Sequence, residues 1–211
     1  MMNILFNSMP TAVSVNGVEF ELNTDFRVWL QVGELFEEMN TADDKNAVFF
    51  DICELVVKTY PEKGYVLGDE LLEGLAQFYR GFPKVDGDKP KKKKEQKDFD
   101  FKYDAGFIYC SFASFYKIRL QTIKYMHWWE FLTLFEGLMM SDQTSMNFVV
   151  GTRQQEIKSK MPKEEKERIQ KLKKQFALPK SETDRKTENN LTNWLMNVGK
   201  DGNGTGDNTS N

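Results

Sequence analysis

His127 is the only histidine in the chain and therefore the first candidate for chemistry. A histidine can serve as a general base beside a serine or cysteine nucleophile, or bind zinc together with cysteines. The sequence contains no nucleophile elbow, and Cys53 and Cys110 stand alone without paired spacing. We therefore expect His127 to pack or cap at the start of a helix. We assign no catalytic residue, no metal site and no cofactor, and we expect the protein not to be an enzyme.

Two further charged patterns could suggest chemistry or binding. Glu130 and Glu136 flank an apolar stripe and could act as paired carboxylates, but they fit the solvated side of an amphipathic helix. The lysine run KPKKKK, with Lys91 to Lys94, resembles a basic nucleic-acid patch. Acidic residues surround this run and the net charge is -3, so we interpret it as a solvated linker and do not expect nucleic-acid binding.

The tandem tryptophans in HWWEFLTLFEGLMM carry the strongest indication of binding. Neighbours on a helix point about 100° apart, so both cannot occupy one narrow stripe. Either both belong to a widened core, or one is presented to a partner, since tryptophan is enriched in binding hot spots. The candidate partner-binding residues of this helix are Trp128, Trp129, Phe131, Phe135 and Met139.

An N-terminal β-hairpin is predicted by VSVNGVEFEL. Asn16-Gly17 is the preferred two-residue turn, and it pairs Val15 with Val18 and Val13 with Phe20. A lone hairpin is marginal in water, so its apolar face must cover something.

Helical spacing of apolar residues predicts about seven helices after the hairpin. Three of them precede a charged loop at residues 84–98, and four follow it. Before the loop, we expect a first helix capped at Asn23 or Thr24, a second with an apolar stripe from Phe49 to Tyr60 that Pro61 ends, and a third that starts at Asp69. After the loop, we expect a fourth helix with a stripe from Phe101 to Phe115 and a fifth that contains the tandem tryptophans. A sixth helix starts at Ser141 or Thr144 and carries Arg153, and a seventh follows Pro162.

The predicted organisation is a mainly α domain over residues 1–178 and a flexible tail over 179–211. One short amphipathic segment, 189–199, interrupts the polar tail and places Leu191, Trp194, Leu195 and Val198 at i, i+3, i+4 and i+7. This is the pattern of a groove-binding peptide. The alternatives are binding to a partner, folding back onto the protein's own groove, or a transient helix without a role.

Bulk composition is that of a globular protein. The 211 residues are 40% hydrophobic and 29% charged, and no apolar run approaches the roughly 18 to 20 residues of a membrane span. The N-terminus lacks the features of a signal peptide. The two isolated cysteines indicate reduced, packed thiols in a cytosolic protein.

Three stretches together resemble the bacteriophage Gp-fifteen family, which long-tailed phages and prophages of Gram-positive bacteria encode. They are DFDFKYDAGFIYCSFASFYKIRLQT, MHWWEFLTLFEGL and VVGTRQQEI, and the resemblance spans roughly residues 10–178. It implies a protein similar to tail assembly chaperones, which bind the tape measure protein before the tail tube polymerises. The partners expected for this chain are the tape measure protein and other tail proteins, in the host cytoplasm. The family carries no established catalytic residues. It usually has an aspartate where this chain has Arg119.

We therefore expect a phage tail assembly chaperone that binds the tape measure protein, with no small-molecule substrate and no membrane. One alternative is a structural tail or connector protein of the virion. A second is a regulatory nucleic-acid-binding protein acting through Lys91 to Lys94. The oligomeric state is left open.

Overall fold

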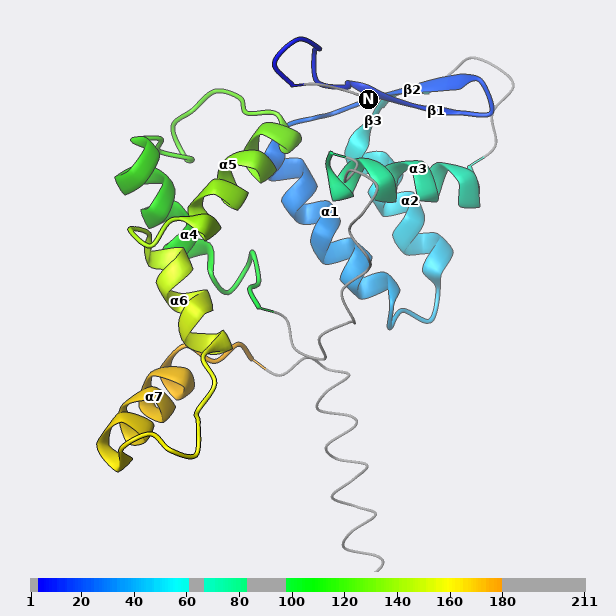
Figure 1. Ribbon diagram of the computed structural model, residues 1–211. Coiled ribbons are helices and arrows are strands. Elements are labelled where there is room, and N and C mark those ends of the chain that lie inside the picture. The colour runs from blue at the N-terminus through cyan, green and yellow to red at the C-terminus, as the bar shows by residue number, and fades with distance from the viewer. Residues whose placement is uncertain (1–3, 61–66, 83–97, 180–211) are drawn as a thin grey trace, which may run out of the picture.

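The computed structural model describes residues 4–60, 67–82 and 98–179 (Figure 1). Within these ranges the chain forms seven α-helices, one π-helical turn and a three-stranded antiparallel sheet. The predicted mainly α fold with an N-terminal hairpin is confirmed. The predicted charged loop, apart from residue 98, and the predicted tail beyond Pro179, with its segment 189–199, lie outside the described residues.

The hairpin has the predicted register. Strand β1, Ala12–Val15, pairs with β2, Val18–Leu22, so that Val13 lies opposite Phe20 and Val15 opposite Val18. Asn16 and Gly17 both have positive φ angles, of 53° and 79°, as the tight turn requires. Phe20 is buried and anchors the sheet on the helices below it.

A third strand, which the sequence analysis did not predict, follows the second helix directly. Helix α2, Lys45–Val56, starts at its cap Asp44, and β3, Val57–Thr59, pairs with β2 through Leu22 and Val57. The expected helix through Tyr60 is therefore wrong. β-Branched residues such as Val57 and Thr59 favour extended backbone, and the edge of β2 supplies hydrogen-bonding partners that a helix end lacks.

Helix α1, Phe26–Met39, is capped by Asp25, whose carboxylate accepts a hydrogen bond from the Arg27 N–H at 2.9 Å. The expected cap at Asn23 or Thr24 is one or two residues too early. The hydroxyl of Thr24 pairs instead with that of Tyr125 at 2.7 Å. Helix α3, Asp69–Arg80, begins at the predicted residue.

The fourth helical stretch is shorter than predicted and changes its winding. Helix α4 spans Ala105–Ser111 and continues as the π-helical turn η1, Phe112–Tyr116, which ends at Lys117 with φ 60°. The wider turn breaks the expected stripe: Phe115 is 41% exposed, while the Tyr116 hydroxyl donates to the Leu134 carbonyl at 3.1 Å.

The remaining helices begin as the sequence predicts. Helix α5 spans Trp128–Met140, α6 spans Ser145–Gln154 after its cap Thr144, and α7 spans Lys163–Gln175 after Pro162. Helix α6 packs on α4 and α5, and α7 packs on α6. Figure 1 shows the sheet at one end of the molecule, beside α1 to α3, and α7 at the opposite end.

The starts of α1 and α5 are joined by a short antiparallel bridge. The Phe26 N–H donates to the Met126 carbonyl at 3.0 Å, and the Trp128 N–H donates to the Thr24 carbonyl at 2.8 Å. The two helices enclose the centre of the core, where Phe131 stacks on Phe26 with ring centroids 4.8 Å apart. This pairing holds together the halves of the chain that precede and follow residue 98.

The two cysteines differ in their surroundings. Cys53 is buried, and burial raises the pKa of its thiol to about 11. Cys110 is exposed on α4, so the prediction that both thiols are packed is wrong for this residue. A seven-residue helix with one solvated side leaves Cys110 outside the core. Among the described helices, none has the length and apolar character to cross a membrane.

Candidate binding groove

Both tandem tryptophans lie in the core. Trp128 is 0% exposed and Trp129 is 7% exposed. Their indole N–H groups donate to carbonyls in the last turn of α3, from Trp128 to Tyr79 at 2.9 Å and from Trp129 to Phe78 at 2.8 Å. Carbonyls at a helix end have no partner within the helix, so the pair closes the end of α3. Burial of both side chains favours the interpretation in which both belong to a widened core.

His127 is the cap of α5, as predicted. Its Nδ1 accepts a hydrogen bond from the Trp129 N–H at 3.0 Å, and its Nε2 lies 2.9 Å from the Pro10 carbonyl oxygen. Because Nδ1 is an acceptor, the ring proton sits on Nε2 and is donated to that carbonyl. Burial lowers the pKa of His127, against smaller opposing effects of the Pro10 carbonyl and Glu130. Both ring nitrogens are thus engaged by the backbone.

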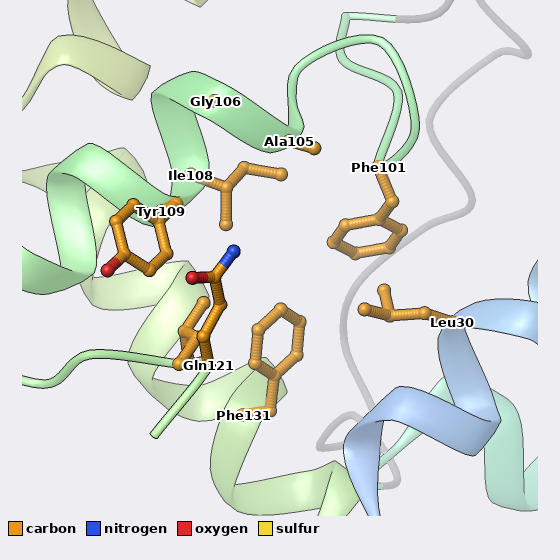
Figure 2. Close-up of a pocket in the computed structure, with 9 residues that line it drawn as sticks. Leu30, Phe101, Ala105, Gly106, Ile108, Tyr109, Gln121 and Phe131 are labelled. Carbon is orange, nitrogen blue, oxygen red and sulfur yellow. The ribbon is translucent and has the colours of Figure 1, made fainter. Parts of the chain in front are cut away.

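A hollow with apolar walls lies between α1, α4 and α5, and we name it the apolar groove (Figure 2). Its volume is about 390 Å³. Figure 2 shows Leu30 and Phe101 on one side, Ile108 and Tyr109 on the other, and Phe131 at the base. The lining residues are Leu30, Phe101, Ala105, Gly106, Ile108, Tyr109, Leu120, Gln121 and Phe131.

Small residues at the start of α4 keep the apolar groove open. Ala105 and Gly106 are both exposed and line it. A methyl group added at Gly106 would meet no atom within 4 Å, so the space beside the helix is unfilled. Larger side chains at these positions are therefore expected to reduce the groove without disturbing the core.

A second hollow, which we name the acidic hollow, adjoins the first and has a volume of about 620 Å³. The two share Leu30 and Phe101 in their walls. Along α1 the lining changes from Leu30 to three glutamates, and the facing segment adds two aspartates. The charged lining residues are Glu34, Glu37, Glu38, Asp98, Asp100 and Lys102.

Arg153 holds the segment 98–104, which contributes Phe101 to the lining of both hollows. Its guanidinium makes a two-pronged contact with the Asp104 carboxylate, with both N–O distances 2.7 Å. It also donates to the Asp98 carbonyl at 3.1 Å and to the Phe176 carbonyl at 2.6 Å. The Asp104 carboxylate in turn accepts from the Asp100 N–H. The Arg153 side chain, which is 12% exposed, therefore positions residues 98–104 against α6 and the end of α7.

The predicted partner-binding residues of α5 contribute to the groove unequally. Phe131 lines the apolar groove directly. Trp128 and Phe135 contact the ring of Phe101, with centroids 6.1 Å and 5.2 Å apart, and so support a residue that lines both hollows. Trp129 packs instead against Phe78 and Phe82, and Met139 is partly buried against the core. Leu191, Trp194 and Leu195 lie outside the described residues.

Several lining residues were not singled out as binding candidates from the sequence. Leu30, Ala105, Ile108 and Tyr109 lie on or beside apolar stripes, a pattern that predicts the buried side of a helix and not a binding site. Leu120 and Gln121 follow the π-helical turn, where no periodicity marks them. A pattern of apolar residues identifies the buried face of a helix, but it does not show where the apolar faces of two neighbouring helices leave a hollow between them.

The model of the family described as "Bacteriophage Gp15 protein" matches residues 5–178. The chain belongs to this Gp15 family. The match covers every described helix and strand of the Gp15-family chain, and it confirms the family resemblance seen in the sequence. Membership indicates a phage structural or assembly protein. A search of curated proteins and a search of solved structures found no match.

Metal chemistry has no visible basis in the described part of the Gp15-family chain. Across residues 4–60, 67–82 and 98–179, no group of three or more His, Cys, Asp or Glu side chains is arranged to hold a metal ion. The lysines at 91–94, considered above for nucleic-acid binding, lie outside these ranges.

Proposed function

We propose that this Gp15-family protein is a phage tail assembly chaperone, which acts without catalysis in the host cytoplasm and holds a segment of the tape measure protein in the apolar groove. The observation that carries the proposal is the groove itself. Two of the three sequence stretches that resemble the family contribute to its walls. The stretch DFDFKYDAGFIYCSFASFYKIRLQT contributes Phe101, Ala105, Ile108 and Tyr109, and the stretch MHWWEFLTLFEGL contributes Phe131.

Groove size and chemistry suit a polypeptide helix. A volume of about 390 Å³ accommodates a few large apolar side chains. A long helical protein awaiting assembly exposes apolar stripes, and covering them lowers the free energy of the unassembled chain. The walls combine rigid aromatic rings with the polar amide of Gln121, which can pair with a polar group at the edge of such a helix.

Co-expression tests this function directly. A tagged copy of this chain should retain the tape measure protein of the same phage through purification, and mass spectrometry of finished particles should detect none of this chain. Presence of the chain in particles at the stoichiometry of a tail component would favour the structural tail or connector alternative. Failure to retain any tail protein, together with normal tails in a deletion phage, would contradict the proposal.

A further inference from the structure

The end of the described chain lies beside the helix that lines the apolar groove. The ring of Phe176 packs edge-on against that of Phe107 on α4, with centroids 5.8 Å apart, and the Phe176 carbonyl accepts a hydrogen bond from Arg153 at 2.6 Å. Phe107 directly precedes Ile108, which lines the groove. Pro179 is three residues beyond Phe176 and therefore at most about 11 Å from it. The chain beyond residue 179 thus leaves the fold close to the apolar groove.

The sequence beyond this point contains one segment, residues 189–199, whose pattern suits the groove. The segment lies outside the described residues. Four of its apolar residues have the spacing that places side chains on one face of a helix. They are Leu191, Trp194, Leu195 and Val198. A helix over these positions is about 12 Å long, and α4, with seven residues, is about 10 Å long, so the two match in length.

Neither the groove nor this segment carries a charge. The described residues that line the groove include no acidic or basic side chain, and their polar groups are the Gln121 amide and the Tyr109 hydroxyl (Figure 2). Residues 189–199 contain no Asp, Glu, Lys or Arg, whereas residues 180–188 are mostly charged. Burial of an unpaired charge in apolar surroundings is costly. Between residues 180 and 211, this segment alone combines large apolar side chains with the absence of charge.

The connection to the fold is long enough for this segment to reach the groove. Eleven residues separate Pro179 from Leu191, and they span at most about 40 Å. This reach exceeds the length of α4 several times. A tether of this length gives an effective concentration in about the millimolar range. The segment of the same chain is therefore favoured over that of a second copy at ordinary protein concentrations.

We propose that residues 189–199 fold back and occupy the apolar groove of their own chain, with Trp194 and Leu195 in the space above Phe131, until the client displaces them. The competition between segment and client rests on the proposed function. The occupied groove keeps its apolar walls covered while no client is present.

Cleavage by chymotrypsin after Trp194 tests the inference on the full-length chain, with the released peptide measured by mass spectrometry. A docked segment is cut only in the fraction of molecules that release it. Ala105→Trp fills the groove and should speed the cleavage at least about tenfold, whereas Ala47→Trp, at an exposed position near the start of α2, should leave it unchanged. Equal rates in Ala105→Trp and the unaltered chain would overturn the inference.

A change within the segment tests the same contact from the other side. Leu191→Asn with Val198→Asn removes two apolar side chains and keeps the cleavage site, and this double variant should be cut about tenfold faster than the unaltered chain. The matched control, Thr192→Ala with Asn197→Ala, changes two residues of the segment outside its apolar stripe and should be cut at the original rate. Absence of any acceleration in the first double variant would also overturn the inference.

Dilution separates docking within one chain from docking between two copies. Contact within a chain does not depend on protein concentration, whereas contact between copies is lost on dilution. We expect the cleavage rate after Trp194 to stay constant over about a hundredfold dilution. Protection that disappears on dilution would overturn the inference and assign the segment to the groove of a second copy.

Tape measure protein added to the same assay separates this inference from the proposed function. Client binding should speed cleavage after Trp194, and the variant L191N with V198N should bind the client more tightly by about the factor of its faster cleavage, since its groove is free in all molecules. Client binding that leaves the cleavage rate unchanged would overturn the competition.

The two ideas can fail separately. If the client binds in the groove but Ala105→Trp is cut no faster than the unaltered chain, the chaperone function stands and the docking of residues 189–199 is wrong. If the segment is protected but no tape measure protein binds, the docking stands and the proposed client is wrong.

Discussion

Arg153 and Asp104 form a two-pronged ion pair, with both N–O distances 2.7 Å and with side chains that are only 12% and 1% exposed. The pair links α6 to Asp104, the residue that precedes α4 and that is followed in the chain by Ala105 of the groove lining. A buried charge whose partner is removed retains its desolvation cost without compensation. The position of residues 98–104, which include Phe101 of the groove lining, therefore depends on this interaction.

Replacement of Asp104 by alanine should lower the free energy of unfolding by about 3–5 kcal/mol, since it leaves the Arg153 guanidinium buried without its carboxylate. Urea titration followed by circular dichroism measures this loss. The control is Glu73→Ala, which removes the exposed partner of Arg80 and should cost less than about 1 kcal/mol. Similar losses for the two variants would contradict the role given to Arg153.

Replacing either of the tandem tryptophans by phenylalanine should lower the stability of the fold, because phenylalanine lacks the indole N–H donor. Trp129→Phe keeps an aromatic ring but removes the indole donor to the Phe78 carbonyl, which then keeps only its hydrogen bond from the Gly81 N–H, and we expect a cost of about 0.5–1.5 kcal/mol. Trp128→Phe removes the indole donor to the Tyr79 carbonyl and should cost about 1–3 kcal/mol, because a part-buried acceptor loses its hydrogen bond. Tyr103→Phe alters a side chain that is 59% exposed and serves as the control, with a change within about 0.5 kcal/mol. Equal melting temperatures for all three variants would show that the indole hydrogen bonds contribute nothing.

Stability should fall as the pH drops through the range in which free histidine gains a proton. Burial lowers the pKa of His127 in the folded chain below 6.5, so the unfolded chain binds the proton more tightly. The contribution of neutral His127 to the free energy of unfolding is therefore present above about pH 6.5 and is lost as the pH falls below that value. The slope from this group is at most about 1.4 kcal/mol per pH unit. Urea midpoints at about pH 7.5 and about pH 5.5 measure the decline.

The control for this pH dependence is His127→Asn. Asparagine is a good helix cap and does not titrate, so the variant should still fold and should lose the contribution of His127 to the decline. The carboxylates, which the variant retains, supply whatever dependence is left. An unchanged difference between the two pH values would contradict the assignment to His127.

Thiol reactivity should distinguish the two cysteines. In the folded protein, Cys110 is exposed and should react at once with a thiol reagent, whereas Cys53 is buried with its pKa raised to about 11 and should react only as the chain unfolds. Cys110→Ser should abolish the fast phase and leave the slow one. Two equally fast thiols, or a fast phase that survives in Cys110→Ser, would contradict the burial of Cys53.

Local patterns predicted the elements well where short-range chemistry decides them. Asn16-Gly17 set the hairpin register, and Thr144, Asp69 and Pro162 marked helix starts correctly. Strand β3 was missed because Val57 follows an apolar helical stripe, and only the neighbouring edge of β2 makes extended backbone favourable there. A tertiary contact overrode the local pattern.

The groove could not be derived from periodicity. Leu30 and Tyr109 appear in the sequence as stripe residues like any other, and Phe131 belongs to the most apolar helix of the chain. Whether facing stripes meet depends on side-chain volume and on the position of residues 98–104, which Arg153 sets from a distance of 49 residues in sequence. The family-like stretch from Phe101 to Tyr109 did indicate the right region.

Affinity for the tape measure protein in a groove-filling variant tests the central claim most directly. Ala105→Trp places a large ring in the apolar groove at an exposed position, and Ala47→Trp makes the same change at an exposed position near the start of α2. With both variants shown to fold by their thermal transitions, we predict that Ala105→Trp weakens binding at least about tenfold, or roughly 1.4 kcal/mol, and that Ala47→Trp binds like the unaltered chain. Equal binding by Ala105→Trp and the unaltered chain would contradict the claim that the groove holds the client.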